Sequence, residues 1–103
     1  MKIALVQQFA GTDVAANRRN ALDRARSAAK DGADIIAFSE LAFLPFLPQN
    51  PAGPGFKDFA ETVPGPTTEM FSELAKEFGV VIVLNLFEEM KGRTYDSLSL
   101  IHI

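Results

Sequence analysis

The chain has 103 residues, of which 48% are hydrophobic and 10% aromatic, and its formal net charge at pH 7 is −3. This composition predicts one globular domain or part of one and excludes a disordered chain. The basic side chains, including Arg18 to Lys30, are spread along one predicted helix as a solvated face, which argues against nucleic acid as a partner. Cysteine is absent, so the chain holds no disulfide, thiolate metal site or thiol nucleophile. The first apolar stretch is too short for a secretory signal and no apolar run approaches about 20 residues, so we expect a cytoplasmic protein without a membrane span.

Periodicity predicts a strand, a helix and a second strand over the first 38 residues. Residues 2–7 form a short apolar run with β-branched side chains, which predicts a buried strand. Thr12 or Asp13 can cap a helix over residues 14–30, whose single apolar stripe is mostly alanine. Residues 34–38 are apolar on both faces, as is typical of a central parallel strand.

Residues 42–66 have a different composition, because all six prolines and four of the phenylalanines lie there. Proline and glycine break regular structure, whereas the phenylalanines argue against a solvated linker. A loop of this length inside a compact domain is usually functional. We expect it to fold over the end of the sheet, with a short helical turn around residues 56–59.

The second half of the chain predicts a helix and a hairpin. Pro66 suits the first turn of a helix that ends at Gly79. Residues 80–86 predict a third strand, residues 88–93 a polar turn, and residues 95–101 a fourth strand paired with the third. The order β-α-β-loop-α-β-β predicts an α/β sheet with right-handed crossovers. Since two helices can cover only one face of four strands, we expect the other face to be uncovered within this chain.

Glu40 directly follows the second predicted strand, at the edge where open α/β sheets place their active sites. Two interpretations remain open: a solvent-contacting residue at the strand end, or a general base whose pKa is raised by apolar neighbours. Phe43 and Phe46 are candidates for both this apolar environment and a substrate pocket, and the alternative is that they only pack in the core. Lys91 is interpreted as a hairpin residue and His102 as incidental.

Metal and cofactor sites have no support in the sequence. One histidine and scattered carboxylates give no cluster with metal-ligand spacing. The single glycine after the first strand does not make the glycine-rich turn that binds a dinucleotide. We therefore expect neither a metal nor a cofactor.

Several motifs together resemble the nitrilase, or carbon–nitrogen hydrolase, superfamily. Residues 38–46 (FSELAFLPF) resemble its first signature, in which proline is commoner than Ser39 before the glutamate. The first strand, residues 65–67 (GPT) and residues 95–98 (YDSL) fit the same family pattern in the same order. The resemblance covers nearly the whole chain, to about Ile101.

The resemblance implies that residues 1–103 are the N-terminal portion of a single carbon–nitrogen hydrolase domain with an αββα sandwich fold. It implies hydrolysis of a small non-peptide amide or carbamoyl compound, closest in style to N-carbamoyl amine amidases, by a homo-oligomer. The family uses a Glu-Lys-Cys set, of which only Glu40 is carried over, as general base and then general acid. The family's lysine follows the fourth strand and its cysteine lies further on; neither is found in this chain, so we expect no turnover from it alone.

A second interpretation, from another functional class, remains open. The chain could be a noncatalytic α/β module that self-associates or binds a partner through its exposed sheet face. The sequence does not explain why it ends at Ile103, or whether His102 and Ile103 belong to the native reading frame. Coding sequence downstream that carries the lysine and the cysteine would favour the enzyme.

Overall fold

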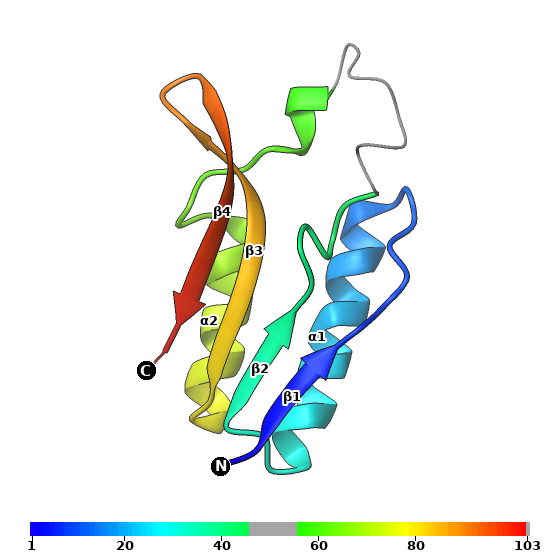
Figure 1. Ribbon diagram of the computed structural model, residues 1–103, viewed down its shortest axis with the longest axis vertical. Helices are drawn as coiled ribbons and strands as arrows, with labels where there is room; N and C mark the ends of the chain where they lie inside the picture. Colours follow the sequence, from blue (N-terminus) through cyan, green and yellow to red (C-terminus); the bar gives the residue numbers. More distant parts are fainter. Residues whose placement is uncertain (46–55, 103) are drawn as a thin grey trace.

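A four-stranded sheet and two α-helices make up the computed structural model over the residues it describes, 1–45 and 56–102 (Figure 1). The elements in chain order are β1 (Ile3–Val6), α1 (Val14–Lys30), β2 (Ile35–Phe38), the 3-10 helix η2 (Phe56–Phe59), α2 (Pro66–Phe78), β3 (Val81–Met90) and β4 (Arg93–Ile101). The sheet order is β1-β2-β3-β4, with β1, β2 and β3 parallel and β4 antiparallel to β3. The predicted α/β order is confirmed.

Both helices pack against the same face of the sheet, α1 behind β1 and β2 and α2 behind β3 and β4 (Figure 1). The alanine stripe of α1 lets this helix lie close to the strands, and Ala21 and Ala25 are fully buried. On the α2 side, Phe71 is fully buried, and its ring centroid lies 5.4 Å from those of Phe38 and Phe43. Burial of one such side chain stabilises the fold by roughly 1.5–3 kcal/mol. This layer between helices and sheet is the hydrophobic core.

Local signals start and end the helices where they are predicted. Asp13, rather than Thr12, caps α1 by accepting a hydrogen bond from a backbone N–H of the first turn at 3.1 Å. Helix α2 begins at Pro66, and Gly79 beyond its end has a left-handed φ of 66°. The 3-10 helix η2 confirms the predicted helical turn.

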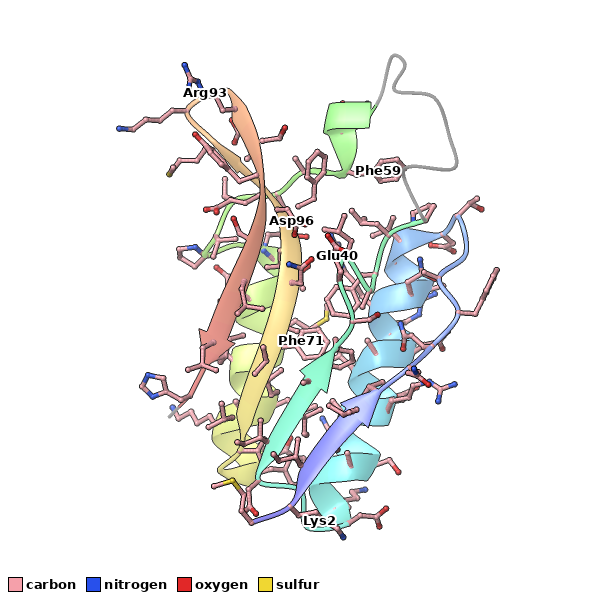
Figure 2. All side chains as sticks on the ribbon, in the orientation of Figure 1. Lys2, Glu40, Phe59, Phe71, Arg93 and Asp96 are labelled. Atoms are coloured by element: carbon pink, nitrogen blue, oxygen red, sulfur yellow. The ribbon has the colours of Figure 1, made fainter. Side chains whose placement is uncertain are left out.

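The predicted polar turn at residues 88–93 is wrong in its extent. β3 continues to Met90 and β4 begins at Arg93, so only Lys91 and Gly92 form the turn, with φ of 52° and 76°. Two-residue turns with positive φ match the twist of the paired strands, and backbone pairing along the long hairpin outweighs the polar character of its side chains. Lys91 is confirmed as a hairpin residue, and Figure 2 shows Arg93 at the hairpin tip.

The opposite face of the sheet is uncovered over the part of the chain that the structure describes. Apolar side chains on its outer strands are largely exposed: Ile3 58% and Leu5 77% on β1, and Leu98 72% and Leu100 61% on β4. The helices therefore cover only one face, as predicted. Within residues 1–45 and 56–102, no helix has the length and the apolar character that a membrane span requires.

Candidate active site

Glu40 lies directly beyond the carboxyl end of β2, where the sequence placed it. Its side chain is exposed, and Figure 2 shows it at the same end of the sheet as Asp96 of β4. The next residue, Leu41, has a φ of 46°, so the chain turns sharply out of the strand. Because β1, β2 and β3 are parallel, their carboxyl ends meet at this edge, which is the usual position of an active site in such sheets.

The Glu40 carboxyl interacts with a second carboxyl group. A hydrogen bond with the Asp96 side chain, the negative charge of Asp96 and a smaller desolvation contribution raise the pKa of Glu40. Ionised carboxylates only accept hydrogen bonds, so this bond exists only while one of the two groups carries a proton. The direction of this shift agrees with the interpretation of Glu40 as a base, although its main cause is Asp96 rather than apolar neighbours, and the exposed side chain agrees with the solvent-contacting interpretation. The role of Glu40 as a base therefore stays a prediction.

Asn85 of β3 connects the turn after Glu40 to Asp96. Its Oδ1 accepts a hydrogen bond from the Leu41 backbone N–H at 2.7 Å. Its Nδ2 donates to Asp96 Oδ1, also at 2.7 Å. The Asn85 amide therefore holds both the backbone of the residue that follows Glu40 and the carboxylate of Asp96.

A narrow cavity adjoins this cluster. Its lining consists of Arg18, Leu41, Phe43, Leu44, Phe59, Glu61, Asn85, Leu86 and Phe87. Its interior of about 10 Å³ is close to the space that one water molecule needs. The residues that follow Glu40 thus form one wall, and β3 and the segment around Glu61 form another.

The two predicted pocket phenylalanines differ in what the structure shows. Phe43 lines the cavity, but it is only 3% exposed and stacks on Phe71 with an interplanar angle of 15°. Most of its ring therefore packs in the core, and its contact with a substrate stays a prediction. Phe46 lies outside the described residues, so its assignment also stays a prediction.

Arg18 corrects the interpretation of the α1 basic residues as a solvated face. Its Nη2 donates to Glu61 Oε2 at 2.8 Å, and its side chain is only 23% exposed. The Glu61 carboxylate also accepts hydrogen bonds from the Thr67 backbone N–H and hydroxyl. The backbone of Glu61 pairs with β3 through Phe87 and Glu89. This network fixes the far wall of the cavity.

Asn85 and Asp96 are the two site residues that sequence reasoning missed. Asn85 was detectable as the single polar residue in the apolar run of residues 80–86. Asp96 lies in the YDSL segment that resembles the family pattern, but its partner depends on the hairpin register. Over residues 1–45 and 56–102, no three or more His, Asp or Glu side chains gather as a metal site would require.

A mixed, mostly parallel α/β sheet with polar side chains at its carboxyl edge is an architecture in which α/β proteins commonly place their functional sites. The family model "Carbon-nitrogen hydrolase" matches residues 2–102, and the chain belongs to this family. The resemblance inferred from the motifs is therefore confirmed.

Individual relatives agree with this assignment. The chain is 31% identical over 99 residues to the omega-amidase NIT2 of Mus musculus, covering 95% of this chain and 34% of that protein. It is 38% identical over 96 residues to the N-carbamoylputrescine amidase of Solanum lycopersicum, covering 91% of this chain and 32% of that protein. The chain thus spans about a third of the length of the curated relatives it matches.

The fold also matches solved structures. A carbon–nitrogen hydrolase from Helicobacter pylori G27 superposes with a TM-score of 0.85 at 22% identity, covering 97% of this chain and 35% of that one. An amidase from Nesterenkonia sp. gives a TM-score of 0.61 at 20% identity over the same share of this chain and 36% of its own. The fold of this chain is therefore that of about a third of a nitrilase-family domain.

Proposed function

We propose that this chain supplies the general base of an amidase-type hydrolase that cleaves the C–N bond of a small non-peptide amide or carbamoyl compound. The observation that carries the proposal is Glu40, a carboxylate with a raised pKa at the carboxyl edge of the sheet in a carbon–nitrogen hydrolase. A base with a raised pKa accepts a proton more readily and can return it in the next step.

In the proposed reaction the Glu40 carboxylate takes the proton of a cysteine thiol, and the thiolate attacks the substrate carbonyl carbon. A lysine stabilises the oxyanion of the tetrahedral intermediate. The C–N bond then breaks as Glu40 donates its proton to the leaving amine, and water hydrolyses the acyl-enzyme. This chain contains Glu40 but not the family's lysine and cysteine, so we expect no turnover from these 103 residues alone.

The proposed substrate class rests on the relatives. The related proteins are named as an omega-amidase and an N-carbamoylputrescine amidase. We propose a small amide or N-carbamoyl amine as substrate, a homo-oligomeric assembly and a cytoplasmic location.

The first measurement is the intact mass of the natural gene product, together with the coding sequence beyond the codon for Ile101. A product that carries the family's lysine and cysteine is expected to release ammonia or amine from ω-amides or N-carbamoyl amines. In that product, Glu40→Gln is expected to lower kcat roughly 10²- to 10⁴-fold, because the base and acid are lost. Glu73→Gln, which makes the same charge change on the exposed surface of α2, is the matched control.

Two outcomes would contradict the proposal. Turnover by the 103-residue chain at the rate of the cysteine-bearing product would exclude the Glu-Lys-Cys mechanism. A cysteine-bearing product whose Glu40→Gln variant keeps full activity would exclude Glu40 as the base.

The uncovered sheet face favours a second candidate function, a noncatalytic module that pairs with a second copy of itself. Exposed apolar side chains lie on both outer strands of this face, which is the arrangement that an association surface requires. A natural product that ends at Ile103, forms a dimer and hydrolyses no amide would support this candidate over the enzyme.

A further inference from the structure

Both polar atoms of the Asn85 side chain form hydrogen bonds. Its oxygen accepts from the Leu41 N–H and its nitrogen donates to Asp96, each at 2.7 Å. Asn85 lies in β3 and Asp96 in β4, so the hairpin brings the two together across the sheet. This arrangement connects three elements at one point, next to Glu40.

The Leu41 hydrogen bond stabilises an unusual backbone conformation. Leu41 has a φ of 46°, in the left-handed region that residues with a β-carbon rarely adopt. The hydrogen bond from its N–H to Asn85 helps to hold this turn. Since Leu41 directly follows Glu40, the same bond fixes the direction in which the Glu40 side chain leaves the strand.

The other hydrogen bond of Asn85 holds the Asp96 carboxylate at the end of the sheet where Glu40 lies (Figure 2). A donor to a carboxylate favours its ionised form, and Asn85 Nδ2 donates to Asp96. The pKa of Glu40 is raised, chiefly by its hydrogen bond with Asp96 and then by the charge of Asp96. From α1 and the segment before α2, Arg18 and Glu61 line the adjoining cavity, but their charges pair with each other at 2.8 Å.

We propose that Asn85 and Asp96 are positioning residues for Glu40. Asn85 fixes the turn that carries Glu40 and also holds the Asp96 carboxylate, which lies at the same end of the sheet as Glu40 (Figure 2). The inference rests on the proposed role of Glu40 as base and acid. It adds two residues on the β3–β4 hairpin to that site.

The test combines a titration with an activity assay. Carboxyl carbon NMR of the 103-residue chain is expected to show that the pKa of Glu40 falls toward its ordinary value in Asp96→Asn. A fall is also expected in Asn85→Ala, because the Asp96 side chain loses the hydrogen bond that holds it in place near Glu40. The Leu41 amide proton is expected to exchange faster with solvent in Asn85→Ala and at the wild-type rate in Asp96→Asn.

Asp23→Asn is the matched control, because it removes an exposed aspartate charge from α1, on the other side of the sheet. It is expected to leave the Glu40 titration unchanged. Asp96 is exposed on the edge strand β4, so Asp96→Asn keeps the test valid even where Asn85→Ala fails to fold. A Glu40 titration that is the same in wild type and Asp96→Asn overturns the proposal.

In a gene product that hydrolyses amides, Asp96→Asn and Asn85→Ala are expected to lower kcat by up to about 100-fold with little change in KM. The acid limb of the kcat/KM profile is expected to move to lower pH in Asp96→Asn. A shifted titration without amidase activity in the natural product would uphold the positioning and reject the proposed function. Amidase activity that needs Glu40 but is insensitive to both variants would uphold the proposed function and reject the positioning role of Asn85 and Asp96.

Discussion

Both faces of the sheet carry apolar side chains, but only the face under the helices contributes them to a core. Ile36, Ile82 and Leu84 on that face are fully buried, whereas Leu5 and Leu98 on the other face are mostly exposed. Burial of apolar area stabilises a fold by about 25 cal/mol per Å², so identical residue types contribute very differently on the two faces. What an apolar side chain contributes here depends on what covers it.

The polar cluster of the candidate site belongs to the uncovered side. Asn85 and Asp96 occupy the same face as Leu98 and Leu100, at the end of the sheet where Glu40 lies. The helix-covered face supplies stability, and the other face combines the proposed chemistry with an apolar surface. Substitutions on the two faces are therefore expected to separate stability from function and association.

The largest effect is expected for Phe71→Ala, in the centre of the covered face. The side chain is fully buried and packs against the rings of Phe38 and Phe43. Its removal leaves a cavity and is expected to lower the free energy of unfolding by about 3–5 kcal/mol, measured by chemical denaturation. Lys76→Ala, on the exposed side of the same helix, is the control and should change it by less than about 0.5 kcal/mol. A loss below about 1 kcal/mol for Phe71→Ala would contradict the assignment of the core.

A smaller loss is expected for Asn17→Ala on α1. Its buried side-chain amide accepts a hydrogen bond from the Gly11 N–H at Oδ1. Its Nδ2 donates to the Gly11 carbonyl and to the Phe43 carbonyl, each at 2.9 Å. The alanine variant leaves these backbone groups unpaired and is expected to lose about 2–3 kcal/mol of unfolding free energy. Asn20→Ala, exposed on the same helix, is the matched control. Equal effects of the two variants would show that the Asn17 hydrogen bonds do not hold the chain after Glu40.

The pH dependence of stability tests the uncovered side. The folded-state pKa of Glu40 is raised, so its stabilising contribution is present below the ordinary glutamate pKa of 4.5 and is lost as the pH rises through the folded-state value. Glu40→Gln abolishes this titration and the repulsion with Asp96. We therefore expect the thermal unfolding midpoint of the variant minus that of wild type to increase as the pH rises from 4 toward 7.

The effect is expected to be smaller than those of the core variants, because solvent screens exposed carboxylates, and to shrink further at high salt. Glu73→Gln should show a flat difference from wild type across the same range. A flat difference for Glu40→Gln as well would show that Asp96 does not act on Glu40 in the folded chain.

The fold was predictable to the extent that its signals are local. The alanine stripe, the Asp13 cap, Pro66 and Gly79 each act within a few residues, and they placed both helices correctly. Glu40 was predictable because it lies two residues after the end of an apolar strand. The hairpin turn was predicted too long because the polar composition around Glu88 is typical of a turn, although the pairing of β3 and β4 extends through these residues.

The partners of the site residues were not predictable in the same way. Asn85 meets Asp96 only because a two-residue turn sets the register of β3 and β4. Arg18 meets Glu61 across 43 positions of sequence, through a segment that pairs with β3 only in the folded chain. Such contacts depend on tertiary arrangement, which side-chain periodicity does not encode.

The smallest effect on stability is expected on the uncovered face, for the double substitution Leu98→Ser and Leu100→Ser. Both side chains are mostly exposed, so their loss removes little buried area, and the free energy of unfolding should stay within about 0.5 kcal/mol per substitution. Self-association should respond strongly instead, because these residues supply apolar surface on the β4 side of that face. Sedimentation velocity over a concentration series is expected to show weaker association than in wild type.

Ser99→Ala, whose side chain points to the helix side of β4, is the control. A double variant that unfolds as readily as Phe71→Ala would mean that the two faces are not distinct, whereas unchanged association would mean that copies of this chain meet through another surface.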